Sequence, residues 1–89
     1  MRQRDFIRVA SFETPRQRLM RIVAAVAYEH AVEVGEIMGS CRQKPLARAR
    51  FDAWHRLRRE GLSYPQIGRM FGRDHSTVVY GVQRWERGA

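Results

Sequence analysis

The sequence predicts a small all-α domain built around a helix-turn-helix. Between residues 67 and 85 the apolar side chains recur at helical spacing in two runs, and Gly72-Arg73 separates the runs. Two helices joined by so short a turn cross at a steep angle, which is the helix-turn-helix arrangement. At 89 residues and 44% apolar content, the chain suits one domain with a modest core of three or four helices.

The N-terminal part divides into a leader and a first helix. Residues 1–13 lack a sustained hydrophobic period, so we expect a partly ordered leader followed by a domain over residues 14–89. Thr14 and Pro15 are typical of an N-cap and a first helical turn, and the helix should run to about His30. We expect His30 to interact only with the helix dipole or with solvent.

The middle of the chain predicts a short helix, a basic loop and a longer helix. Residues 32–38 form a short apolar element that ends at Gly39-Ser40, and residues 41–44 follow as a basic loop. Pro45 opens the next helix, which should end at about Glu60 before Gly61. The arginines of this helix are expected on its exposed surface: Arg48, Arg50, Arg56, Arg58 and Arg59.

The two helices of the motif carry recognisable start signals. Ser63 and Gln66 form a capping-box pattern at the start of the first helix. We expect the carboxylate of Asp74 to cap the second helix by accepting from its first N–H groups. This places three polar residues at the helix start, where a recognition helix presents side chains to base edges: His75, Ser76 and Thr77.

The charge distribution favours a polyanionic partner. The net charge is +8, and residues 39–60 alone contribute +5. Sixteen of the seventeen basic residues are Arg, whose guanidinium suits bidentate contacts with phosphate and guanine. The main alternative is a small basic helical adaptor that binds an acidic protein partner through the same arginines.

Several other classes of protein are disfavoured. Asp74, His75 and Ser76 are consecutive helical residues that point about 100° apart, so they cannot align as a hydrolase triad. The histidines and Cys41 lack the spacing of metal ligands, and we expect no enzyme activity, metal or cofactor. The sequence has no membrane-spanning run of about 18 apolar residues and no signal peptide. We therefore expect a cytoplasmic, nucleoid-associated location.

Residues 72–79, GRDHSTVV, preceded by Ile67-Gly68, resemble the signature of the C-terminal DNA-binding domain of the bacterial replication initiator DnaA. The resemblance spans roughly residues 22–85. It implies a Trp-repressor-like fold, with double-stranded DNA, in the form of a DnaA-box-like site, as the partner. The chain departs from the family pattern at Phe51, where Gln is common, at Ser76, where many members have Thr, and at Gly81, where Ser or Ala is usual.

The resemblance also implies a set of DNA-contacting residues. His75 and Ser76 would face the major groove, with Asp74 near cytosine and Thr77 beside them at the helix start. Arg42 would enter the minor groove, where the negative potential of A·T-rich DNA attracts guanidinium. The remaining expected contacts are to the backbone or, for Arg50, to bases or backbone: Lys44, Arg48, Arg50, Arg58, Tyr64, Pro65 and Arg73.

The sequence has no G-x-x-x-x-G-K-[S/T] phosphate loop, so we expect it to act without ATPase activity. The start at Met1 and the end at Ala89 favour a stand-alone protein over an excised fragment. Such a protein would regulate transcription or replication initiation. The sequence leaves open which process is regulated, which DNA sequence is bound, the oligomeric state, and whether the origin is chromosomal, phage or a mobile element.

Overall fold

The computed structural model describes residues 13–88, and within this range it is helical without strands. This confirms the all-α class. The N-terminal leader expected over residues 1–13 lies, apart from Glu13, outside the described residues. The helices are α2 Pro15–His30, α3 Val34–Met38, α4 Lys44–Arg59, α5 Tyr64–Phe71 and α6 His75–Glu86.

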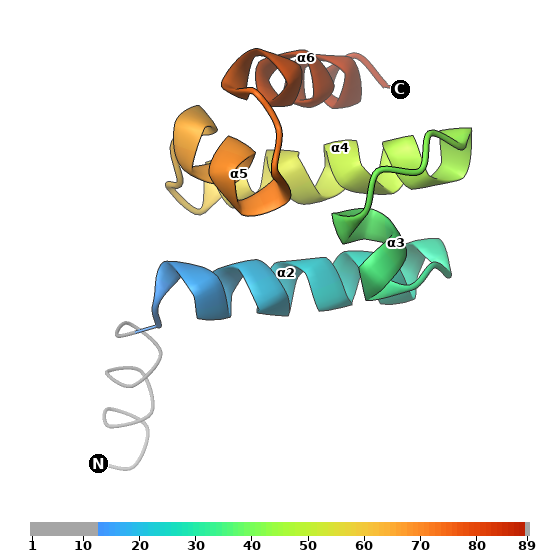
Figure 1. Cartoon of the computed structure of the whole chain (residues 1–89), viewed down its shortest axis with the longest axis horizontal. Helices are drawn as coiled ribbons and strands as arrows, with labels where there is room; N and C mark the ends of the chain where they lie inside the picture. The colour runs from blue at the N-terminus through green and yellow to red at the C-terminus, as the bar shows by residue number, and fades with distance from the viewer. Residues whose placement is uncertain (1–12, 89) are drawn as a thin grey trace, which may run out of the picture.

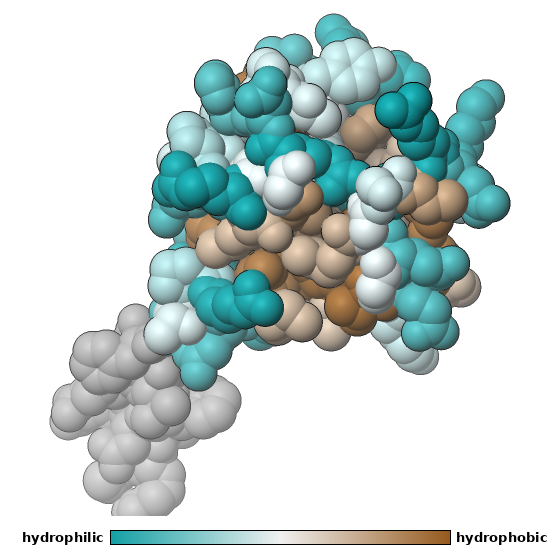
Figure 2. Space-filling model, viewed as in Figure 1, coloured by the Kyte–Doolittle hydropathy of each residue, from teal (hydrophilic) through white to brown (hydrophobic). Residues whose placement is uncertain are grey.

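Helix α4 lies in the middle of the fold, with α2 on one side and α6 on the other (Figure 1). Its apolar face supplies buried side chains to the core, including Trp54, which is 1% exposed, and Leu57. The core continues into α2 through Leu19 and Val23 and into α6 through Val78. Figure 2 shows hydrophobic residues gathered in the centre of one face, with hydrophilic residues around them.

Local capping chemistry sets the helix ends. Thr14 Oγ1 accepts from the N–H of Gln17, and the Gln17 side chain accepts from the N–H of Thr14. Ser63 and Gln66 form the same reciprocal pair at the start of α5, as the sequence predicted. The predicted helix bounds therefore agree with the observed ones to within about two residues.

Two glycines make the turn between α5 and α6 possible. Gly72 ends α5 at φ +66°, in the left-handed region that glycine adopts without strain. A Cβ at Gly68 would lie 2.5 Å from the carbonyl oxygen of Arg73, so only glycine lets the turn pack this closely on α5. The helix-turn-helix is therefore present where the sequence placed it.

His30 differs from its expected role. Its Nε2 lies 2.8 Å from Oδ2 of Asp52, a carboxylate buried on α4. Arg56 donates to both oxygens of the same carboxylate and also to Glu29 on α2. His30 thus belongs to a polar network that ties α2 to α4, and Arg56 is not a free surface charge. No helix among the described residues has the length and apolarity needed to cross a membrane.

Candidate nucleic-acid interface

The start of α6 presents polar side chains to solvent. His75, Ser76 and Thr77 are all exposed in the first turn of α6, whereas Val78 and Val82 further along the helix are buried. Helical periodicity turns Val78 and Val82 toward α4 and α5. The first turn of α6 is therefore free to meet a partner.

Asp74 occupies the N-cap position of α6, but its carboxylate makes no capping hydrogen bond. The expected side-chain cap is wrong. Instead, the backbone carbonyl of Asp74 accepts from the N–H of Thr77 at 3.1 Å. The Asp74 side chain is exposed, so its carboxylate remains available to a ligand.

Arg50 is an internal anchor for the basic loop. It is 5% exposed, and its Nε, Nη1 and Nη2 donate to the carbonyls of Ile37, Cys41 and Glu36 at 2.8, 2.6 and 2.8 Å. Glu36 and Ile37 lie at the end of α3, where helical carbonyls have no partner of their own. Burial, with a smaller contribution from the positive charge of Arg73, lowers the pKa of Arg50. The expectation of a surface-exposed Arg50 is therefore wrong.

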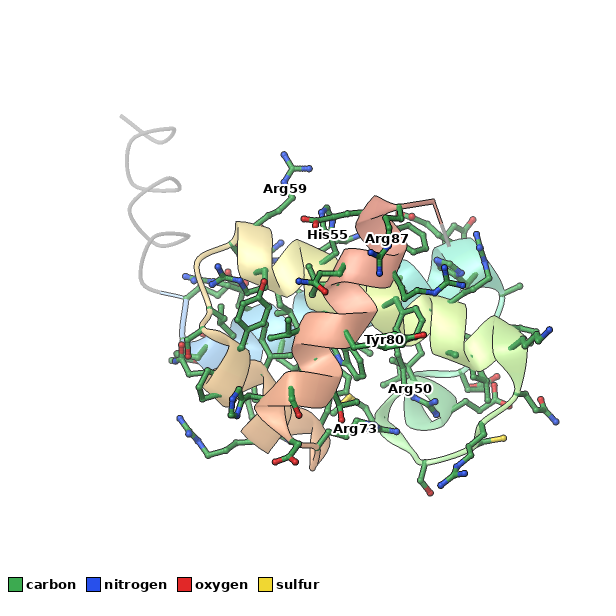
Figure 3. The ribbon with its side chains drawn as sticks, turned by 90° about the horizontal axis from the view of Figure 1, so that it is seen from above. Arg50, His55, Arg59, Arg73, Tyr80 and Arg87 are labelled. Carbon is green, nitrogen blue, oxygen red and sulfur yellow. The ribbon has the colours of Figure 1, made fainter. Side chains whose placement is uncertain are left out.

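Arg73 joins the basic loop to the turn of the helix-turn-helix. Its Nη2 donates to the carbonyl of Gly39 at 2.8 Å, and its Nη1 donates to that of Phe71 at 3.0 Å. Figure 3 shows Arg50 and Arg73 near one another between α6 and the loop that precedes α4. An open hollow of about 700 Å³ separates the loop from the turn, and Arg42 and Thr77 line it from opposite elements.

The arginines near the loop and the motif keep their charge uncompensated. Within residues 13–88, the arginines that form ion pairs are Arg18, Arg21 and Arg56, and all three lie on α2 or α4. The cations expected to contact DNA are absent from those pairs: Arg42, Lys44, Arg48, Arg50, Arg58 and Arg73. The exposed members of this group, Arg42, Lys44, Arg48 and Arg58, therefore present their positive charge to solvent.

Arg58, which is exposed near the end of α4, packs on the half-buried Tyr64 at the start of α5. The guanidinium carbon of Arg58 lies 4.3 Å from the centre of the Tyr64 ring, and its Nη1 donates to the carbonyl of Leu62 at 2.9 Å. Pro65 is exposed next to them. On the other end of α4, the Arg48 guanidinium lies 5.6 Å from the ring centre of the half-buried Trp85. Both cations are held in place by aromatic rings and remain exposed.

Phe51 and Gly81, two positions at which the chain departs from the family pattern, lie against each other. A Cβ at Gly81 would lie 2.7 Å from Cδ1 of Phe51 and 2.5 Å from Cε3 of Trp54, so α6 approaches α4 closely at this point. The adjacent Tyr80 is 55% exposed and lies one turn after Ser76. Tyr80 was not among the predicted site residues, although its four-residue spacing from Ser76 places both residues on one face of the helix.

Comparisons with known proteins point in the same direction. The family model described as the bacterial DnaA protein helix-turn-helix matches residues 8–84. A chromosomal replication initiator protein DnaA from Thermomicrobium roseum is 39% identical over 67 residues, which cover 73% of this chain and 14% of that relative. The chain thus aligns with about a seventh of the relative's length. No solved structure gives a significant match.

Proposed function

The chain belongs to the bacterial DnaA helix-turn-helix family, and on that basis we propose that it binds double-stranded DNA sequence-specifically through α6 and the basic loop. The observation that carries the proposal is the arrangement of the loop beside the turn. Arg50 and Arg73 fix the loop by hydrogen bonds, while Arg42 remains exposed on it. One duplex can then meet the helix in its major groove and the loop in the adjacent minor groove.

The start of α6 supplies the base-reading groups. The imidazole of His75 donates to a purine N7 or to a carbonyl oxygen, and the short side chain of Ser76 lets the helix approach the bases. The Asp74 carboxylate, which makes no capping hydrogen bond, accepts from the amino group of cytosine. Thr77 lines the same hollow as Arg42. These residues carry the sequence preference.

Contacts to the backbone fix the position of the domain on the duplex. Lys44 and Arg48 lie at the start of α4 and neutralise phosphates on the loop side. Arg58, Tyr64 and Pro65 meet phosphates beside α5. Arg73 contributes through the loop that it orients, and Arg50 acts as a positioning residue because its guanidinium is buried on backbone carbonyls.

We further propose that the chain acts as a stand-alone regulator of transcription or replication initiation at a DnaA-box-like site, without ATPase activity. Family membership supports the binding of DNA, and the 89-residue sequence contains no G-x-x-x-x-G-K-[S/T] phosphate loop. Such a domain occupies initiator sites without hydrolysing ATP, and thus competes with proteins that need the same DNA.

Selection of bound duplexes from a random pool tests the proposal. We expect enrichment of one site, with binding to that site weakening as salt rises. With the four exposed cations Arg42, Lys44, Arg48 and Arg58 at the interface, the slope of log K against log salt should be about −3.6. Failure to enrich any sequence, together with no duplex affinity at low salt, would contradict the proposal and favour the acidic-protein adaptor.

A further inference from the structure

Four aromatic rings contact one another in a row that leads from the core to the exposed surface of α6. The ring centres of Phe71 and Trp54 are 5.7 Å apart, those of Trp54 and Phe51 are 5.8 Å apart, and those of Phe51 and Tyr80 are 6.1 Å apart. The outer pair meets edge to face, with 85° between the ring planes. These separations and angles are favourable for aromatic contacts, so the series holds the Tyr80 ring in one place.

The close approach of α6 to α4 makes this support possible. Gly81 lies directly over Phe51 and Trp54, and a Cβ there would overlap both rings. Because α6 packs so closely on α4, the neighbouring Tyr80 contacts the Phe51 ring edge to face while about half of the residue remains exposed. Figure 3, which looks down on α6, shows Tyr80 between α6 and the N-terminal half of α4.

Tyr80 shares a face of α6 with Ser76. Four helical residues correspond to a rotation of about 40° and a rise of about 6 Å, so Tyr80 lies one turn further along the same face. Val78 and Val82 are each two residues away and are buried about 160° round the helix. A groove that receives Ser76 therefore also receives the ring of Tyr80.

We propose that Tyr80 is a further sequence-reading residue, whose ring packs against the 5-methyl group of a thymine in the major groove. The inference rests on the proposed function. The thymine methyl is the apolar feature of the major-groove floor, and Tyr80 offers the exposed apolar ring of the α6 face that meets it. Ser76 has no methyl group, so Tyr80 supplies the thymine contact from one turn away. Phe51 is a positioning residue, because it sets the orientation of the Tyr80 ring.

Deoxyuridine tests the inference, since it differs from thymidine only by the missing methyl group. In the selected site each thymine is replaced singly by deoxyuridine, and binding is measured for the wild-type chain and for variants. At one position we expect wild-type affinity to fall about four-fold, the gain from burying one methyl group. Tyr80→Ala should lose about the same factor on the thymine duplex and show no further loss on deoxyuridine at that position.

Three further variants separate the roles. Tyr80→Phe keeps the ring and should retain the wild-type response to deoxyuridine. Phe51→Leu keeps the apolar packing but removes the edge-to-face partner, and should reduce the response at the same position. The matched control is Tyr28→Ala, because Tyr28 is 88% exposed on α2 and should leave binding unchanged.

Two results would overturn the inference. One is that, at every thymine position, Tyr80→Ala loses as much affinity on deoxyuridine substitution as the wild-type chain does. The other is a loss in Tyr80→Phe as large as in Tyr80→Ala, which would assign the contact to the hydroxyl group. Both leave the proposed function intact, because the wild-type chain still selects a site. A wild-type chain that selects no site refutes the proposed function and this inference with it.

Discussion

Arginine performs opposite roles on the two sides of this small domain. On the α2–α4 side, Arg21 and Arg56 are neutralised by carboxylates that link one helix to the other. On the side formed by the loop and the helix-turn-helix, Arg42 and Arg58 are exposed and absent from the ion pairs of the described residues. Pairing with carboxylates, and not arginine content alone, therefore decides which arginines can present their charge to a partner.

The largest effect should come from Arg50, which belongs to neither side because its guanidinium is buried and donates to backbone carbonyls. Arg50→Met leaves the carbonyls of Glu36, Ile37 and Cys41 without this donor. We expect the free energy of unfolding to fall by about 3 kcal/mol, measured by urea denaturation. Arg59→Met is the matched control on the exposed surface of α4 and should change stability by less than about 0.5 kcal/mol. Equal stability of the two variants would remove Arg50 as the anchor of the loop.

On the side formed by the loop and the helix-turn-helix, the informative variant is His75→Ala. We expect a loss of about 1 to 3 kcal/mol in binding free energy on the selected site and little loss on random duplex, because direct base readout is lost. Titration of labelled duplexes at one salt concentration measures both. The base-reading role is wrong if random duplex loses as much affinity as the selected site.

Arg58→Ala should weaken binding to selected and random duplex nearly equally. It removes one phosphate contact, so the slope of log K against log salt should become shallower by about one. The matched control is Arg59→Ala, since Arg59 is the next residue on α4 and points away from the body of the domain in Figure 3. An unchanged slope in Arg58→Ala would place that guanidinium outside the interface.

The smallest effect should appear in the acid stability of the α2–α4 side. Hydrogen bonds from Arg21 and Arg56 lower the pKa of Glu13 and Glu29, respectively, below the ordinary value of 4.5. A folded-state pKa that is lowered adds stability above pH 4.5, and that stability is lost as the pH falls below this value. The melting temperature should therefore fall on acidification from pH 5, and less steeply in a variant combining Arg21→Gln with Arg56→Gln. Identical pH profiles would argue against these pairs as a source of stability.

Local chemistry made much of the fold predictable. The starts of α2 and α5 are set by nearby capping residues, Thr14 with Pro15 and Ser63 with Gln66. The end of α5 is set by Gly72. No contact between distant residues is needed to predict these helix ends. The same holds for the apolar stripes that form the core. The signature around His75 was sufficient to identify the family, because it is a continuous stretch of sequence.

The remaining features depend on contacts between distant residues. Arg50 is buried because the fold brings the end of α3 to α4, and no periodicity within α4 reports the carbonyls that α3 leaves unpaired. His30 meets Asp52 across two helices for a similar reason. The four-residue spacing places Tyr80 on the same face as Ser76, but the support of its ring by Phe51 depends on the contact between α6 and α4. The assignment of DNA-contacting residues remains a prediction.

The salt dependence of DNA binding in two single variants tests the division between the two sides most directly. Arg42→Gln removes an exposed cation of the loop, whereas Arg56→Gln removes an arginine paired with Asp52 and Glu29. We predict that Arg42→Gln makes the slope of log K against log salt shallower by about 0.9, while Arg56→Gln leaves the slope unchanged. Equal slopes in the two variants, or a shallower slope in Arg56→Gln alone, would contradict this prediction.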